Sequence, residues 1–343
     1  MTHSGGVLAA LALAALAAAG CSVSGRRPAT FAEAAREKSD VTIVVTDSGL
    51  GGLSVVADLA SRLPSSGVVR SARIVFVNAL LDDAIGYNDL RDEADKVRVF
   101  DAALEAMERR YAPDLILIAC NTLSVFYERT LHARRGTTET VSIVPMGVDL
   151  VERALRERPE ARAVLFATKG TIDSNAHRRL LEQRGIAADR IVGQACPRLT
   201  GAIERGAHDA ETASRIEGFV KEAVGRLGDR PGPVVASLNC THFGYARPLW
   251  EEAFERLGHP AVTVLDPNPL MADHVLRAGG ERRFPGTAGT VEGVSKTPIG
   301  GGVEGAPRAP PPPGSPATAE ALARYTHVPD LFHVEIEPSA ILR

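Results

Sequence analysis

Short apolar runs alternate along the chain with longer segments in which apolar residues recur every three or four positions. The apolar runs lie at 41–45, 73–77, 115–119, 141–144, 163–167 and 234–238. The segments between them have the periodicity of amphipathic helices, as at 53–63 and 92–111. Strands that are apolar on both faces and alternate with helices are typical of parallel sheets covered on both sides. The pattern therefore predicts an α/β fold of doubly wound parallel sheets.

The ends of these strands repeat along the chain. The strand at 41–45 leads to Asp47, which lies 73 residues before Cys120 at the end of another strand. The strand at 163–167 leads to Thr168, which lies 72 residues before Cys240. We therefore predict two pseudo-symmetric lobes that face each other, with a site between them.

The N-terminal segment has the pattern of a targeting sequence. Residues 7–19 contain only Val, Leu and Ala, a run shorter than the roughly 20 residues of a membrane-spanning helix. The run leads to Gly20-Cys21, and small residues before a cysteine resemble the lipobox of bacterial lipoproteins. We predict a signal peptide at 1–20, a lipid on Cys21 and a tether at 21–40. The protein would then be a membrane-anchored lipoprotein facing the periplasm or the cell exterior, and cytoplasmic if the signal is not used.

The C-terminal part has a different composition. Residues 286–320 contain Gly300-Gly301-Gly302 and four consecutive prolines from Pro310, with few large apolar residues. This composition is typical of a linker. We therefore predict a Pro/Gly-rich linker at 286–320, followed by a tail at 321–343 that has apolar residues but no recognisable motif.

Composition and charge exclude several classes of function. A net charge of −3 over 343 residues gives no support for nucleic-acid binding. Four cysteines are too few for a disulfide scaffold, and the histidines lack the spacing of a metal site. The Gly-rich turn at 47–52 fits neither the dinucleotide nor the P-loop pattern. We therefore expect no metal and no cofactor.

Two cysteines carry the candidate chemistry. Cys120 and Cys240 each follow a strand and precede an expected helix, at the sheet edge where α/β proteins bind ligands. A helix N-terminus favours an anion, so we expect a lowered pKa for both thiols. Inversion of an α-carbon without a cofactor needs a base on one face and an acid on the other, which two facing thiols would supply. Asp47 and His242 are the neighbours that would set which thiol is ionised, and Cys196 is expected to be inert.

Five short motifs place polar residues and glycines at strand ends. They are Asp47-Ser48-Gly49-Leu50-Gly51-Gly52, Ala119-Cys120-Asn121-Thr122, Ala167-Thr168-Lys169-Gly170-Thr171, Ala195-Cys196-Pro197 with Glu204-Arg205-Gly206, and Cys240-Thr241-His242. Over about residues 41–275 the chain resembles the glutamate racemases, a branch of the aspartate/glutamate racemase superfamily. The resemblance implies a cofactor-independent racemase of two α/β lobes, linked to D-glutamate supply for peptidoglycan in the cell wall.

The resemblance also implies roles for individual residues. Cys120 and Cys240 would be the acid/base pair, with Asp47 assisting the first and Glu204 and His242 assisting the second. The residues that would hold the substrate are Ser48, Gly86, Asn121, Thr122, Thr168, Thr171 and Thr241. The family's chain path implies a first lobe of 41–145 plus about 250–285 and a second lobe of 146–249. The expected partner is a small amino-acid substrate, and the resemblance leaves a homodimer open.

A few residues depart from the family's pattern. Asn78 stands where an aspartate is usual, Ile85 where a tyrosine precedes Gly86, and Asn239 where a glycine precedes Cys240. Because the loop around Gly86 contacts substrate in that family, an aspartate or hydantoin racemase is an alternative. A lipid-anchored amino-acid-binding protein with the same fold is another, although a receptor needs no paired thiols. The presence of both cysteines disfavours a decarboxylase.

Overall fold

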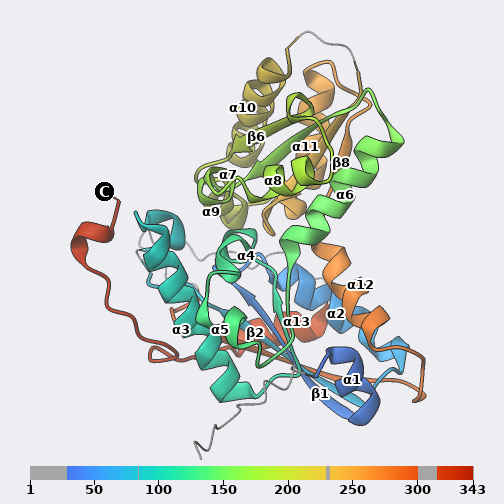
Figure 1. Cartoon of the computed structure of the whole chain (residues 1–343), viewed down its shortest axis with the longest axis vertical. Helices are drawn as coiled ribbons and strands as arrows, with labels where there is room; N and C mark the ends of the chain where they lie inside the picture. The colour runs from blue at the N-terminus through green and yellow to red at the C-terminus, as the bar shows by residue number, and fades with distance from the viewer. Residues whose placement is uncertain (1–28, 84, 229–231, 300–314, 343) are drawn as a thin grey trace, which may run out of the picture.

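The computed structural model describes residues 29–83, 85–228, 232–299 and 315–342. It has two lobes, each built on a parallel β-sheet, with α6 (Ile143–Glu157) and α12 (Asn268–Ala278) between them (Figure 1). The first sheet has the strand order β10-β9-β2-β1-β3-β4, and the second has the order β6-β5-β7-β8. The predicted α/β fold of parallel sheets is therefore confirmed.

The two sheets share one arrangement of strands. The first contains β1 (Asp40–Asp47), β2 (Ser71–Asn78), β3 (Leu115–Ile118) and β4 (Thr140–Ser142). The second contains β5 (Arg162–Ala167), β6 (Ile191–Ala195), β7 (Val234–Asn239) and β8 (Thr263–Leu265). In each sheet the earliest of these four strands lies between the next two along the chain. This common order is the pseudo-symmetry that the spacing of the strand ends predicted.

Helices cover both faces of the first sheet. Ile43 and Val45 of β1 point to the face covered by α1 (Phe31–Glu37), α2 (Leu53–Ser66) and α12. Val44 points to the opposite face, covered by α3 (Glu93–Tyr111). The short helices α4 (Asn121–Tyr127) and α5 (Leu131–Arg135) pack beside α3. Successive side chains of a strand alternate between faces, so an uninterrupted apolar run fills both cores.

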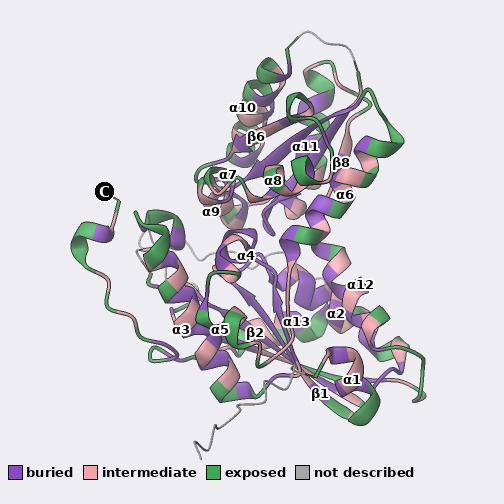
Figure 2. Ribbon diagram, in the orientation of Figure 1, coloured by how far each residue is buried: buried purple, intermediate pink, exposed green. Residues whose placement is uncertain are grey.

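The second sheet is covered in the same way. Leu165 points to the face covered by α6 and α8 (Ala176–Gln183). Phe166 points to the opposite face and packs on Trp250, with the ring centroids 4.5 Å apart. The helices on that side are α9 (Leu199–Arg205), α10 (Ala210–Leu227) and α11 (Arg247–Arg256). Every residue of β5 and β7 is buried, and Figure 2 shows the exposed residues on the outer faces of the helices.

The chain returns to the first lobe later than predicted. Helix α11 packs against α10, and β8 pairs with β7, so residues 247–265 belong to the second lobe. The predicted return near residue 250 is therefore wrong, and α12 is the first returning element. β8 has only three residues, too few to produce a recognisable apolar run.

Much of the predicted linker at 286–320 belongs to the first lobe. β9 (Ala288–Ser295) pairs in parallel with all eight residues of β2, and Arg73 and Glu292 form two hydrogen bonds of 2.7 Å across this pair. α13 (Pro316–Ala323) packs on β9, and β10 (Thr326–His327) forms the edge of the sheet. Residues 300–314 lie outside the described part of the chain. The linker prediction is wrong for β9 because a half-exposed strand with two glycines has no continuous apolar run.

The predicted tether at 21–40 also contains core residues. The hydroxyl of Thr30 accepts a hydrogen bond from the backbone N–H of Glu33 and caps α1, whose Phe31 is buried. The tether prediction is therefore wrong for the part from α1 to the start of β1. Cys21 and the predicted signal peptide lie outside the described residues. In the part of the chain that the structure describes, no helix is long and apolar enough to cross a membrane.

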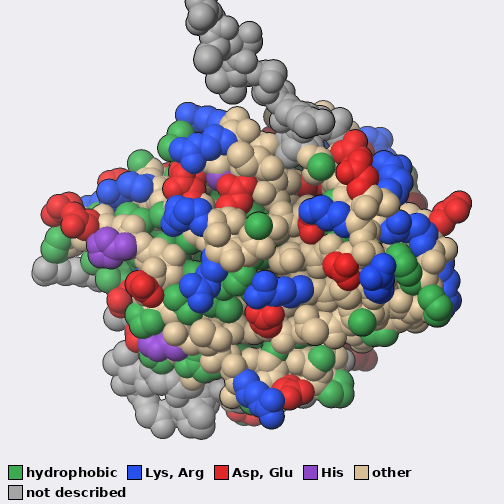
Figure 3. All heavy atoms as spheres, turned by 90° about the horizontal axis from the view of Figure 1, so that it is seen from below, with side chains coloured by type: hydrophobic (Ala, Val, Ile, Leu, Met, Phe, Trp, Pro, Cys, Tyr) green, Lys and Arg blue, Asp and Glu red, His purple; other side chains and the backbone are tan. Residues whose placement is uncertain are grey.

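The described surface is mixed in charge. Acidic and basic side chains are interspersed over the lower face seen in Figure 3, in keeping with the net charge of −3. Several ion pairs join residues one helical turn apart, such as Arg62 with Asp58 at 3.0 Å. Exposed pairs of this kind contribute about 0.3–0.5 kcal/mol each. The apolar cores of the two lobes are therefore the main source of stability.

Candidate active site

The carboxyl ends of the central strands of both sheets meet at one cavity of about 330 Å³. Its lining residues are Asp47, Ser48, Gly49, Leu80, Asp82, Asp83, Gly86, Tyr87, Asn88, Asp89, Cys120, Asn121, Thr122, Thr168, Thr200, Gly201, Glu204, Cys240, Thr241 and His242. Of the residues predicted to act on a substrate, only Thr171 is missing from this lining. No group of three or more His, Cys, Asp or Glu within the described ranges could hold a metal ion.

Cys120 lies between β3 and α4, with its thiol in a negative environment. Its Sγ is 3.1 Å from the hydroxyl of Ser48, and the residue is buried. Burial and the nearby Asp47 carboxylate raise the pKa of the Cys120 thiol. The expected lowering by the helix N-terminus is therefore wrong for Cys120, because desolvation and a like charge outweigh it. At neutral pH Cys120 is a neutral thiol, the form that donates a proton.

Asp47 connects the two lobes. It ends β1 in the first lobe, and the hydroxyl of Thr241 in the second lobe donates a hydrogen bond of 2.8 Å to its Oδ2. Burial raises the pKa of the Asp47 carboxyl, while the positive charge of His242 and this hydrogen bond act in the opposite direction. Asp47 thus couples the electrostatics of the Cys120 side to those of the Cys240 side.

His242 lies between Cys240 and Glu204. Its Nδ1 is 3.9 Å from the Cys240 sulfur, and its Nε2 is 2.8 Å from Oε1 of Glu204 on α9. Burial lowers the pKa of the imidazole, but the interactions with Cys240 and Glu204 outweigh it and raise the pKa well above its usual value. At neutral pH a cation therefore faces the Cys240 thiol, whereas a carboxylate lies beside Cys120.

Three threonines form a cluster where the lobes meet. The hydroxyl of Thr122 is 2.8 Å from that of Thr168 and 3.2 Å from that of Thr171, and the latter two are 3.1 Å apart. Thr122 and Thr168 line the cavity, and the buried Thr171 is outside its lining. Thr171 thus supports the two threonines at the cavity wall through its hydroxyl, and that it also holds substrate stays a prediction.

Gly51 explains why the turn after β1 is rich in glycine. A Cβ at this position would collide with the side chain of Thr241 and would lie 2.6 Å from Nδ1 of His242. The turn of the first lobe therefore approaches the second lobe more closely than a residue with a side chain allows.

Comparison with known sequences identifies the family. Residues 43–275 match the sequence profile of the Asp/Glu/Hydantoin racemase family. The chain belongs to this family. The racemase is 31% identical over 279 residues to a glutamate racemase of Paracoccus denitrificans, covering 74% of this chain and 94% of that relative. It is 33% identical over 266 residues to a glutamate racemase of Ruegeria sp., covering 73% and 91% of the two chains.

Solved structures share the racemase fold. Glutamate racemase from Thermus thermophilus in complex with beta-chloro-D-alanine has a TM-score of 0.58 at 22% identity, covering 84% of this chain and 96% of that one. Escherichia coli glutamate racemase in complex with L-glutamate and the activator UDP-MurNAc-ala has a TM-score of 0.54 at 22% identity, with the same coverage. The family match and the two glutamate racemase relatives confirm the predicted activity: the protein is an amino-acid racemase, an isomerase.

Asn121 of the racemase carries a donor without a partner. Its Oδ1 accepts a hydrogen bond of 3.2 Å from Nε2 of His177, which lies on α8 in the second lobe. Within the described residues its buried Nδ2 group has no hydrogen-bond partner. A buried donor without a partner costs free energy, so a substrate oxygen placed there would gain a strong contact. His177 thus fixes the orientation of the amide that faces the cavity.

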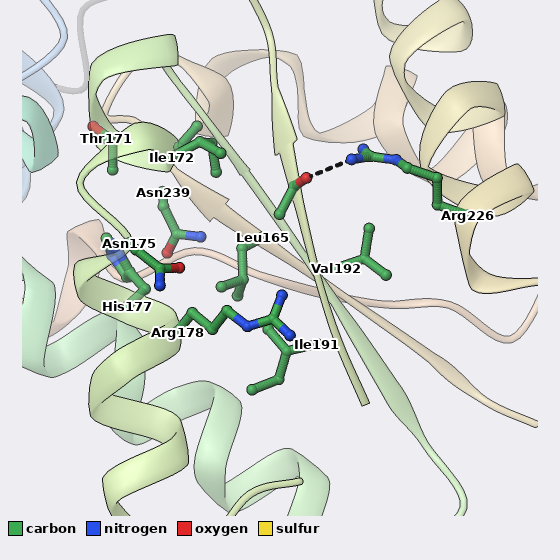
Figure 4. A pocket seen from close by; sticks show the side chains of 12 residues that line it. Leu165, Thr171, Ile172, Asn175, His177, Arg178, Ile191, Val192, Arg226 and Asn239 are labelled. Carbon is green, nitrogen blue, oxygen red and sulfur yellow. Dashed lines mark hydrogen bonds between the residues drawn. The ribbon is translucent and has the colours of Figure 1, made fainter. Parts of the chain in front are cut away.

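His177 also borders a second cavity, of about 310 Å³, within the second lobe. Figure 4 shows His177 near Asn175 and Asn239 on one side, with Arg226 bonded to the Gly193 carbonyl on the other. Burial lowers the pKa of His177 to about 4. The neutral imidazole is therefore the form present in the folded racemase at pH 7.

This buried histidine predicts a loss of stability in acid. The unfolded chain binds a proton at His177 near pH 6.5, whereas the folded chain binds it only near pH 4, so stability falls as the pH drops through this window. We expect His177 to contribute about 3 kcal/mol of the loss. Denaturant unfolding of the wild type and His177→Gln between pH 7 and 4 measures it. If the free energy of unfolding fell equally with pH in both proteins, the prediction would be contradicted.

Some residues of the racemase site were not anticipated from the sequence. Thr200 precedes Glu204 by four residues on α9, so both side chains lie on one face of the helix. This spacing is the sequence signal that could have identified Thr200 as a site residue. Tyr87 and Asn88 follow Gly86 directly, but no local pattern distinguishes them. The role of Asn88 depends on the second lobe, because its Oδ1 accepts a hydrogen bond of 3.1 Å from the backbone N–H of Gly170.

Proposed function

We propose that the racemase interconverts L- and D-glutamate by a two-thiol acid/base mechanism. The observation that carries this proposal is that Cys120 and Cys240 come from opposite lobes and line one cavity with opposite electrostatic partners. The relatives that match over most of their length are glutamate racemases. A glutamate racemase of Francisella tularensis with the same fold is known in complex with D-glutamate.

In this mechanism each enantiomer is deprotonated by one thiolate and reprotonated by the other thiol. Beside Cys240, protonated His242 stabilises the thiolate that removes the α-proton, and Glu204 holds the imidazole in place. Cys120 then donates its proton to the opposite face of the planar carbon. In the reverse direction Cys120 is the base, and its proton passes toward the buried Asp47 carboxylate nearby. The thiols exchange roles, so no external acid or base is consumed.

The substrate's carboxylates would be held by neutral donors. Described residues that line the cavity include no lysine or arginine, so His242 is the cation of the site. The Nδ2 group of Asn121 and the hydroxyls of Thr122, Thr168 and Ser48 are donors at the wall. Hydrogen bonds to carboxylates are among the stronger ones, since the acceptor is charged.

Circular dichroism tests the substrate directly. Purified protein should erase the optical activity of both L-glutamate and D-glutamate and should act far more slowly on L- and D-aspartate. If aspartate is turned over as fast as glutamate or faster, the proposal of glutamate as the substrate is wrong and aspartate takes its place. Absence of turnover with all four would overturn the proposed activity.

We propose further that the racemase is a lipoprotein anchored through Cys21, facing the periplasm or the cell exterior, and that it contributes D-glutamate to cell-wall metabolism. The support is the apolar run at 7–19 followed by Gly20-Cys21. A fatty-acid probe should label the wild type and not Cys21→Ala, and unlabelled cytoplasmic wild type would contradict the anchor. A homodimer is part of the same proposal, and sedimentation of the purified protein tests it.

A further inference from the structure

The loop at 78–91 connects β2 to α3 and forms one wall of the active-site cavity. Its residues Tyr87, Asn88 and Asp89 line the cavity, and Asn88 bonds to Gly170 of the second lobe. The position of this loop therefore determines the shape of the site and the contact between the lobes.

Residues beyond the family match at 43–275 hold both ends of this loop. At its start, Nδ2 of Asn78 donates a hydrogen bond of 3.1 Å to the hydroxyl of Ser295 at the end of β9. Lys296 follows β9, and its Nζ donates a hydrogen bond of 2.8 Å to the carbonyl of Leu81. The end of β9 and the residue after it therefore hold the first residues of the loop.

The far end of the loop pairs with the end of the described chain. Leu90 and Ile341 form an antiparallel bridge. The backbone N–H of Arg91 donates to the Ala340 carbonyl at 2.7 Å, and that of Leu342 donates to the Asp89 carbonyl at 2.7 Å. In Figure 1 the tail runs beside α3 to reach this point. The tail thus acts as a short strand against the loop.

Apolar residues anchor the tail before it reaches the loop. Val328, Leu331 and Phe332 are buried in the same core cluster as Tyr87 and Leu90. This core fixes the start of the tail, so the pairing at 340–342 joins two segments that are already close.

Tyr87 is the residue whose position this arrangement controls. It is buried, and its hydroxyl has no hydrogen-bond partner among the residues that the structure describes. Tyr87 is also among the residues that line the cavity with Cys120. A buried hydroxyl without a partner is a donor available to a ligand, at a cost of about 1–3 kcal/mol while it is unpaired.

We propose that the C-terminal segment at 338–342 is a positioning element of the active site, which pairs with residues 89–91 and thereby holds Tyr87 and Asn88 in the substrate-binding wall. This role rests on the proposed racemase reaction for its kinetic readout. The segment itself does not line the cavity, so it acts through the loop.

A matched pair of variants tests the pairing. Leu342→Pro removes the N–H that bonds to Asp89, whereas Leu342→Ala keeps it, and the leucine side chain is 48% exposed. Ile341 already has φ −93° and ψ 129°, which a following proline accepts. We expect Leu342→Pro to raise KM for both enantiomers about 3–10-fold with little change in kcat, and Leu342→Ala to match the wild type. A chain ending at Glu337 should show the larger rise.

Hydrogen–deuterium exchange provides a readout that does not need turnover. The peptide covering 86–91 should exchange faster in Leu342→Pro than in Leu342→Ala and the wild type. If the wild type shows no turnover of glutamate but the exchange pattern is as expected, the proposed substrate is wrong and the pairing of the two segments still holds. Unchanged exchange, or faster exchange with unchanged KM in an active enzyme, would overturn the positioning role.

Discussion

Replacing either active-site thiol by a hydroxyl should abolish racemisation. We expect Cys120→Ser and Cys240→Ser each to lower kcat by at least about 10³-fold, because serine is a far weaker acid and base near neutral pH. Both side chains are buried and similar in volume to serine, so the fold should persist. Loss of circular dichroism from L- and D-glutamate measures the rate. Cys196→Ser is the matched control: Cys196 is buried in the same lobe as Cys240 but lies outside the cavity.

The two variants should differ in which enantiomer exchanges its α-proton. A variant that keeps one thiol retains a base on one face only, so it can take deuterium from solvent into one enantiomer without inverting it. We expect the Cys120 and Cys240 variants to select opposite enantiomers, as followed by proton NMR in D₂O. Substantial turnover by either variant, or the same enantiomer selected by both, would contradict the two-thiol mechanism.

Removing the cation beside Cys240 should have the next largest effect. We expect His242→Gln to lower kcat about 10²–10⁴-fold, because the thiolate then forms without a positive partner in a buried site. The interactions with Cys240 and Glu204 raise the pKa of His242 despite its burial, so the wild type keeps the cation at neutral pH and loses it only as the pH rises through the raised value. Loss of the imidazolium proton at high pH should lower kcat of the wild type, and this decline should be absent from His242→Gln.

The pH profile of kcat between pH 6 and 10 measures this difference. His208→Gln, on an exposed histidine of the same lobe, is the control and should match the wild type. Glu204→Gln should give an intermediate loss and a profile shifted to lower pH, since it removes the charge that supports the imidazolium. If the wild type and His242→Gln had identical pH profiles, the alkaline decline in kcat would come from another group and the prediction would be contradicted.

The strands β1 to β5 and β7, and the motifs that line the cavity, followed from the sequence. β5 and β7 are buried on both faces, so their apolar runs were unambiguous. β9 was missed because it is exposed over its first residues and includes two glycines. β8 and β10 were missed because they are short, and the lobe boundary moved with β8. β6 was missed because a glycine and a glutamine interrupt its apolar residues. An apolar run in the sequence indicates a strand that is buried along its whole length, and these four strands are not.

The sequence by itself determined the α/β class, the repeated strand ends and the motifs that carry Cys120, Cys240 and their neighbours, because those depend on residues close together in the chain. Only the tertiary structure decided the state of the Cys120 thiol, since its raised pKa comes from burial and from Asp47, which lies on a different strand. The same holds for the bond between His177 and Asn121 and for the pairing of Leu90 with Ile341. Each joins segments far apart in sequence, and such contacts form only when the chain has folded.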